Sequence, residues 1–166
     1  MFRKHRVVST VILLSLLLAL PMNVLANKRI FKARLSTSNE LHTVVGSTAT
    51  GSFVLGTNPD GTMHFMLRVI NLSGPATGAH IHAPADTTQT AGVKLTLCGG
   101  PAPAVTGACT TVDGVLFIEA DIPANYLQPG VTPAMFVGWL DSGLAYVNVH
   151  TALNPGGETR GQIIPQ

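Results

Sequence analysis

From residue 31 onward, apolar and polar side chains alternate along much of the chain. Phe31, Ala33 and Leu35 are separated by charged residues, which is the two-residue period of a strand with one buried face. Phe65 and Leu67 belong to a second run with the same period. The further strands predicted from this period, or from short apolar runs between turns, cover residues 47–55, 63–69, 79–83, 93–98, 116–122, 146–150 and 158–163. Strands this short and numerous predict a protein built mainly from β-structure.

Turn residues and one helical segment complete the pattern. Asn, Pro, Asp and Gly at residues 57–61, and Asn, Pro and Gly at residues 154–157, predict hairpin turns. A short helix is predicted to begin after Thr132 as its N-cap and to end at residues 142–143. The side chains spaced to pack one face of this helix are Met135, Phe136, Trp139 and Leu140. We predict an all-β fold, an antiparallel Greek-key or immunoglobulin-like sandwich of about seven or eight strands with one short helix.

The first 26 residues have the order of a secretory signal peptide. Three basic residues precede an apolar run at residues 7–20, and small residues follow up to Ala26. We predict cleavage after Ala26, which leaves one domain of residues 27–166. The apolar run is shorter than the roughly 20 residues of a membrane span, and no later segment supplies one. The mature protein is therefore expected to be secreted, periplasmic or otherwise extracellular, with no membrane span.

Cleavage also changes the charge of the protein. The whole chain has a formal net charge of +2, and the loss of Arg3, Lys4 and Arg6 lowers it to −1. A nearly neutral domain lacks the positive surface that binds nucleic acid or anionic lipid, so neither is expected as a partner. The remaining basic residues near the first strand are interpreted as a solvated strand face. They are Lys28, Arg29, Lys32 and Arg34.

The two cysteines of the chain, Cys98 and Cys109, lie in a segment rich in Gly and Pro. In a protein predicted to reach an oxidising compartment, such a pair is expected to form a disulfide that closes a loop. A catalytic redox pair is disfavoured because the spacing is far from C-x-x-C.

Two blocks of sequence resemble the chordin-type (CHRD) domain family. The first, residues 72–85, contains the run Gly-Ala-His-Ile-His-Ala-Pro-Ala, and the second, residues 143–163, contains the run Asn-Pro-Gly-Gly-Glu-Thr-Arg-Gly-Gln. The resemblance extends over about residues 30–163. It implies an extracellular, mostly β domain of the kind found in animal developmental regulators and in small exported bacterial proteins. It implies no particular activity.

A fainter likeness concerns residues 78–82, which resemble the Gly-x-His-x-His strand that holds metal in copper/zinc superoxide dismutases. This likeness implies a superoxide-dismutase-like sandwich as an alternative form of the fold. The dismutase zinc loop, with its further His and Asp residues, has no counterpart in the sequence, so dismutation is not favoured.

The candidate metal ligands are His80, His82 and His150. Side chains two apart in a strand leave the same face, so His80 and His82 can chelate together, and His150 can join them if its strand is a neighbour. Imidazole ligation favours copper or zinc over magnesium or calcium, and the affinity is expected to fall below about pH 6.5. The alternative is that His80 and His150 are buried structural donors that hold a turn carbonyl or the loop after Pro84.

The sequence favours a binding or structural module over an enzyme, since it contains neither a G-x-S-x-G elbow nor a phosphate-binding glycine loop. Glu158 and Arg160 are interpreted as an ion pair or as a brace for the hairpin that contains Asn154. Trp139 and Tyr146 are interpreted as core or helix-docking residues. The leading hypothesis is a module without a cofactor that binds an unidentified protein or cell-envelope component. The alternative is a histidine-based copper- or zinc-binding protein, and a dismutase-like metalloenzyme comes third.

Overall fold

The computed structural model describes residues 28–58 and 60–166. These residues form nine strands, two short 3-10 turns and one α-helix. The signal peptide predicted for residues 1–26 lies outside the described residues. The elements are β1 (Arg29–Ser36), η1 (Thr37–Asn39), β2 (Thr50–Thr57), β3 (Met63–Ile70), β4 (Ala76–His82), β5 (Val93–Gly99), β6 (Thr111–Val112), β7 (Val115–Ile122), η2 (Ala124–Tyr126), α1 (Pro133–Asp141), β8 (Ala145–Thr151) and β9 (Thr159–Pro165).

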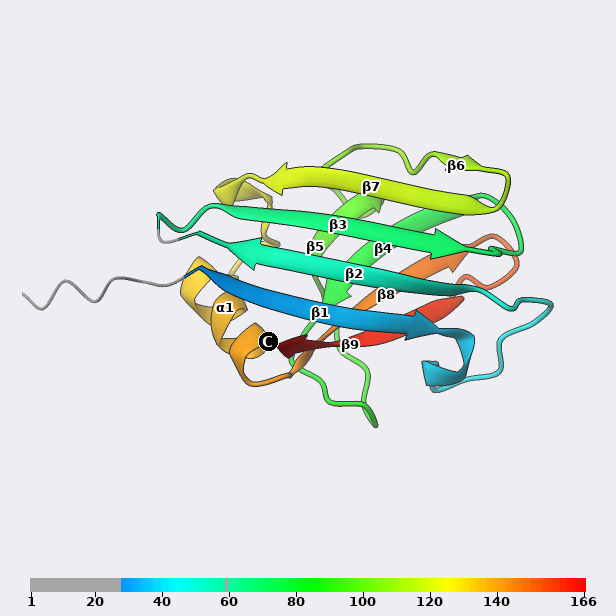
Figure 1. Cartoon of the computed structure of the whole chain (residues 1–166), viewed down its shortest axis with the longest axis horizontal. Helices are drawn as coiled ribbons and strands as arrows, with labels where there is room; N and C mark the ends of the chain where they lie inside the picture. The colour runs from blue at the N-terminus through cyan, green and yellow to red at the C-terminus, as the bar shows by residue number, and fades with distance from the viewer. Residues whose placement is uncertain (1–27, 59) are drawn as a thin grey trace, which may run out of the picture.

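The strands pair in the order β5-β4-β8-β9-β1-β2-β3-β7-β6, and every pair of neighbours is antiparallel. The sheet curls so that β1, β2, β3 and β7 lie over β4, β5 and β8 (Figure 1). The all-β antiparallel fold with one short helix is thus confirmed. The two layers belong to one continuous sheet, because β1 and β9 pair between them.

The core lies between these two layers and follows the predicted alternation. In β1, Phe31, Ala33 and Leu35 are buried, while Lys32 and Arg34 are exposed. Burial of the apolar face drives this arrangement, since each fully buried large apolar side chain contributes about 1.5–3 kcal/mol. The largest fully buried side chains are Phe31, Phe53, Phe65, Phe136, Leu55, Leu67, Ile81, Leu95, Leu97, Leu116, Leu140 and Ile163.

Helix α1 begins as predicted, because the Thr132 hydroxyl accepts a hydrogen bond from the Met135 amide at 3.2 Å and caps the first turn. Phe136 and Leu140 are buried against the core. The prediction that Met135 packs on the same face was wrong, since this side chain is 45% exposed. A helix this short buries only a narrow face, here that of Phe136 and Leu140, and Met135 lies outside this face. Among the described residues, no helix is long and apolar enough to cross a membrane.

Candidate functional site

Strands β4 and β8 are antiparallel neighbours, as the histidine hypothesis requires. Gly78 lies opposite His150, and His82 lies opposite Tyr146. Because Ala79 and Ile81 point into the core, pleat geometry directs the histidines of β4 to the outer face of the sheet. The outer face of these two strands therefore carries the three predicted histidines together.

The three imidazoles lie in contact distance of one another. The ring centroids of His80 and His150 are 4.9 Å apart, those of His80 and His82 are 5.7 Å apart, and those of His82 and His150 are 6.3 Å apart. One ring nitrogen from each residue lies within 4.8 Å of the others. The strand of His150 is thus the neighbour that the candidate metal site requires, and His150 lies near both His80 and His82.

Each ring also forms a hydrogen bond with the backbone of a different loop. His82 donates from Nδ1 to the Ala91 carbonyl at 2.8 Å, and His150 donates from Nδ1 to the Pro155 carbonyl at 3.0 Å. His80 donates from Nε2 to the Gly100 carbonyl. His80 and His150 therefore also have the structural role that was considered as the alternative. The acceptor of His80 is the Gly100 carbonyl, and the acceptor of His150 is the Pro155 carbonyl. Neither acceptor belongs to the loop after Pro84.

These bonds determine which nitrogen of each ring remains free. A carbonyl oxygen can only accept, so the bonded nitrogen carries the proton and the other nitrogen keeps its lone pair. The other nitrogens are His80 Nδ1, His82 Nε2 and His150 Nε2, and all three are buried without a hydrogen-bond partner. Buried polar atoms are usually satisfied, so three adjacent exceptions need a physical explanation.

The environment keeps all three imidazoles neutral near pH 7. Burial is the main cause that lowers the pKa of His82 to about 4, and the nearby His80, His150 and Arg160 act in the same direction. Burial, followed by the charge of His80, lowers the pKa of His150 to about 4. Burial also lowers the pKa of His80. The loss of metal affinity that the sequence predicts below about pH 6.5 is therefore expected only at lower pH.

Gly78 provides the space that His80 occupies. A Cβ atom at Gly78 would lie 2.9 Å from His80 Cε1 and 3.1 Å from His80 Nε2. Any larger residue would displace the ring from the Gly100 carbonyl, so the glycine of the Gly-x-His-x-His run is required by packing.

Tyr146 and Arg160 extend the site in a way that the sequence did not reveal. The Tyr146 ring stacks on the His82 ring with a centroid distance of 4.8 Å and an interplanar angle of 3°. The Arg160 guanidinium lies over the Tyr146 ring, 3.6 Å from its centroid. Tyr146, interpreted from the sequence as a core or helix-docking residue, is buried at 4% exposure, but it packs between His82 and Arg160 on the outer face. The sequence signal for this position was the two-residue period, which places Tyr146 on the same strand face as Asn148 and His150.

Glu158 and Arg160 do not form an ion pair with each other. Glu158 is fully buried and accepts hydrogen bonds from Ser47, Ser73, Thr151 and Asn154. The predicted brace through Asn154 is correct, whereas the predicted ion pair is wrong because Arg160 points to Tyr146 and to the Asp86 carbonyl, 2.7 Å away.

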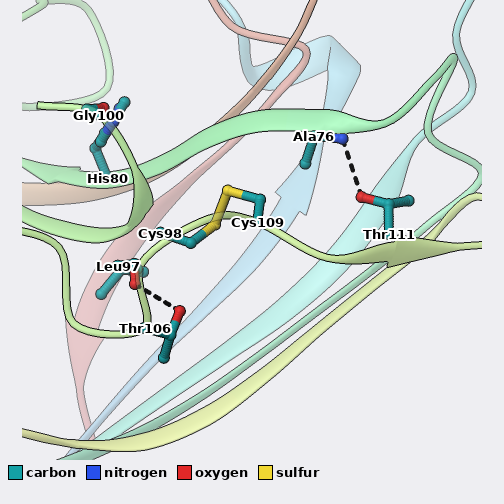
Figure 2. Close-up of a disulfide and its surroundings, with 8 residues drawn as sticks. All are labelled: Ala76, His80, Leu97, Cys98, Gly100, Thr106, Cys109 and Thr111. Carbon is teal, nitrogen blue, oxygen red and sulfur yellow. Dashed lines mark hydrogen bonds between the residues drawn. A yellow bond between two sulfur atoms is a disulfide. The ribbon is translucent and has the colours of Figure 1, made fainter.

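Cys98 and Cys109 form the predicted disulfide, with their Cα atoms 5.0 Å apart. Figure 2 shows that the closed loop carries Gly100, whose carbonyl accepts the His80 hydrogen bond. Thr106, from the same loop, donates from its hydroxyl to the carbonyl of Leu97 in β5 at 3.1 Å. The disulfide therefore anchors a backbone group that orients one of the three histidines.

Replacing both Cys98 and Cys109 with alanine is expected to lower the free energy of unfolding by about 2–3 kcal/mol, because the unfolded chain gains loop freedom. Urea unfolding of the parent and of the double variant measures this difference. Reduction of the parent with a thiol reagent should reproduce it. Equal unfolding midpoints in all three samples would contradict the prediction.

Among the described residues, two further histidines are not part of the three-histidine cluster, although His42 is near enough to His150 to help lower its pKa. His64 is exposed on β3 and pairs with Asp121 and Glu119. His42 is also exposed, and its ring contacts the Gly157 carbonyl at 3.1 Å.

Fold and site together define an all-β domain with a histidine cluster on the outer face of β4 and β8. The chain matches the CHRD domain family over residues 31–163 and belongs to this family, as its resemblance implied. No curated protein and no solved structure matches the chain. Membership and the disulfide indicate an extracellular or otherwise oxidising location.

Proposed function

We propose that the chain is an exported metal-binding protein whose CHRD domain holds one copper or zinc ion on His80, His82 and His150. The observation that carries this proposal is the set of three buried, unpartnered imidazole nitrogens on adjacent strands. In metal sites, a ligating histidine typically donates its other N–H to a carbonyl or carboxylate, which fixes the tautomer. All three histidines have this second bond.

The distances fit an ion after a small movement of the rings. Copper or zinc bound at about 2.1 Å holds imidazole nitrogens about 3.4 Å apart. One ring nitrogen of each histidine lies within 4.8 Å of one from each of the other two, so such a set of nitrogens needs to move inward by less than about 1 Å to share an ion. An all-imidazole ligand set suits copper or zinc rather than magnesium or calcium.

The role that best suits this site is retention of an ion in a binding module, without catalysis. The unpartnered nitrogens are buried, which disfavours access by a large substrate. The carbonyls of Ala91, Gly100 and Pro155 come from three separate loops. An ion bound to the histidines would therefore hold these loops together, and it is expected to raise the stability of the folded state.

Calorimetric titration of metal-free protein comprising residues 27–166 with Cu(II) and Zn(II) tests the proposal. We expect one ion per chain, and at least about 100-fold weaker binding in His80→Ala and His150→Ala, because a lost ligand should cost more than a lost supporting group. The matched control is His64→Ala, which removes an exposed imidazole outside the cluster. Near-ultraviolet circular dichroism checks that each variant keeps its fold.

Absence of binding in the parent protein would overturn the proposal. Equal losses in His64→Ala and His150→Ala would show that the ion binds elsewhere. If His80→Ala proves unfolded, His150→Ala alone decides, since its hydrogen bond is to the exposed Pro155 loop.

A further inference from the structure

A groove of about 680 Å³ lies on the outer face of β1 and β9. Residues 38–41, which follow β1, and Thr87 from the loop after β4 also line it. Its volume falls in the range of about 300–1,000 Å³ that is usual for small-ligand sites. None of the three histidines lines the groove, although its Arg160 stacks on Tyr146, which in turn stacks on His82.

Three cations line the groove. Lys32 and Arg34 come from β1, and Arg160 comes from β9. Among the described residues, none of these three has a carboxylate oxygen within 4.0 Å. The sequence suggested only a solvated strand face for Lys32 and Arg34, because the approach of Arg160 depends on the pairing of β1 with β9.

The one side-chain carboxylate in the lining, Glu40, interacts with Arg160 but offsets only part of the charge of the three cations. It accepts a hydrogen bond from Asn148 at 2.7 Å and lies 3.8 Å from the His42 ring. Its side chain is 4% exposed, and burial raises its pKa. The groove therefore keeps an excess of positive charge in a domain whose overall charge is slightly negative.

Arg160 is held in place before any ligand arrives. It is 2% exposed, its Nη2 donates to the Asp86 carbonyl at 2.7 Å, and its guanidinium stacks on Tyr146. A fixed guanidinium loses little freedom when it binds a carboxylate, and burial strengthens such a bond. Burial also lowers the pKa of Arg160, because it disfavours the charged guanidinium. An anion bound in the groove would stabilise that charge.

The rest of the lining suits a ligand rich in hydroxyl groups. Ser38 and Thr87 supply hydroxyls, and Gln166 supplies an amide. No aromatic side chain lines the groove, so it lacks the stacking surface that binds nucleic-acid bases.

We propose that this groove binds a carboxylate-bearing saccharide, with Arg34 and Arg160 on the carboxylate and Lys32 on a neighbouring charge. This proposal is independent of metal binding, and it identifies a chemical class for the cell-envelope or extracellular partner that the sequence left open. Such a saccharide offers both the anionic group and the hydroxyls that the lining matches.

Titration with a galacturonic acid trisaccharide tests the proposal, and the fully methyl-esterified trisaccharide is the uncharged control ligand. We expect Arg34→Gln to weaken binding about 10-fold or more, because a charge-assisted hydrogen bond is lost. Arg68→Gln, which removes an exposed cation on β3 outside the groove, should leave binding within about twofold. Binding should also persist in His150→Ala, whatever the outcome for metal.

Three results would each overturn the proposal: no binding of the acid trisaccharide, equal binding of the methyl ester, or equal losses in Arg34→Gln and Arg68→Gln. Inorganic phosphate that competes at the same concentration as the trisaccharide would show a general anion site, which also contradicts it.

Discussion

Replacing Glu158 with glutamine is expected to lower the free energy of unfolding by about 3–4 kcal/mol, because hydrogen bonds to a buried charged group are lost together. The carboxylate accepts from the Ser47 hydroxyl at 2.6 Å and from the Ser73 amide and hydroxyl at 2.7 and 2.6 Å. It also accepts from Thr151 and Asn154. In glutamine, one carboxylate oxygen is replaced by an NH2 group, which would face donors instead of acceptors. The hydroxyl groups can rotate away, but the Ser73 backbone N–H cannot.

The control for this variant is Glu119→Gln, which makes the same chemical change at a side chain that is 46% exposed on β7. Its ion pair with His64 is at the surface, so the expected cost is about 0–1 kcal/mol. Urea unfolding at neutral pH measures both variants. If Glu158→Gln costs no more than Glu119→Gln, the network does not stabilise the fold as argued.

The strands and the shared face of His80 and His82 could be predicted because each depends on local geometry. Side chains two apart in a strand leave one face, whatever the rest of the fold does. The disulfide was equally predictable, since only two cysteines exist. The helix start at Thr132 also followed from local capping chemistry.

Features that depend on strand register and loop conformation could not be predicted. The opposition of Gly78 and His150 follows from the pairing of β4 with β8 across more than 60 residues of sequence. The sequence likewise does not reveal that Ala91 and Gly100 supply carbonyls to histidines. The ion pair expected between Glu158 and Arg160 was wrong because Ser47 and Ser73, distant in sequence, satisfy the carboxylate.

A second large effect is expected from pH: metal-free protein should lose several kcal/mol of stability as the pH falls from about 6.5 toward 4. Burial holds the pKa of His82 and His150 at about 4 in the folded state, whereas the unfolded chain titrates near 6.5. Between these values the unfolded state binds protons that the folded state does not, so stability rises with pH across this window. Each pKa unit of difference contributes about 1.4 kcal/mol for each histidine.

The comparison of pH 7 with pH 5 isolates this effect, because few carboxylates titrate there. Urea unfolding at both values should show a clear loss for the parent protein, and a double variant with His82→Gln and His150→Gln should lose most of that difference. His64→Gln provides the opposite control: hydrogen bonding to Asp121 raises the pKa of this exposed histidine, so its removal should leave the destabilisation at pH 5 in place. Equal stability of the parent protein at pH 7 and pH 5 would show that these imidazoles accept protons in the folded state, contrary to their burial and hydrogen bonding.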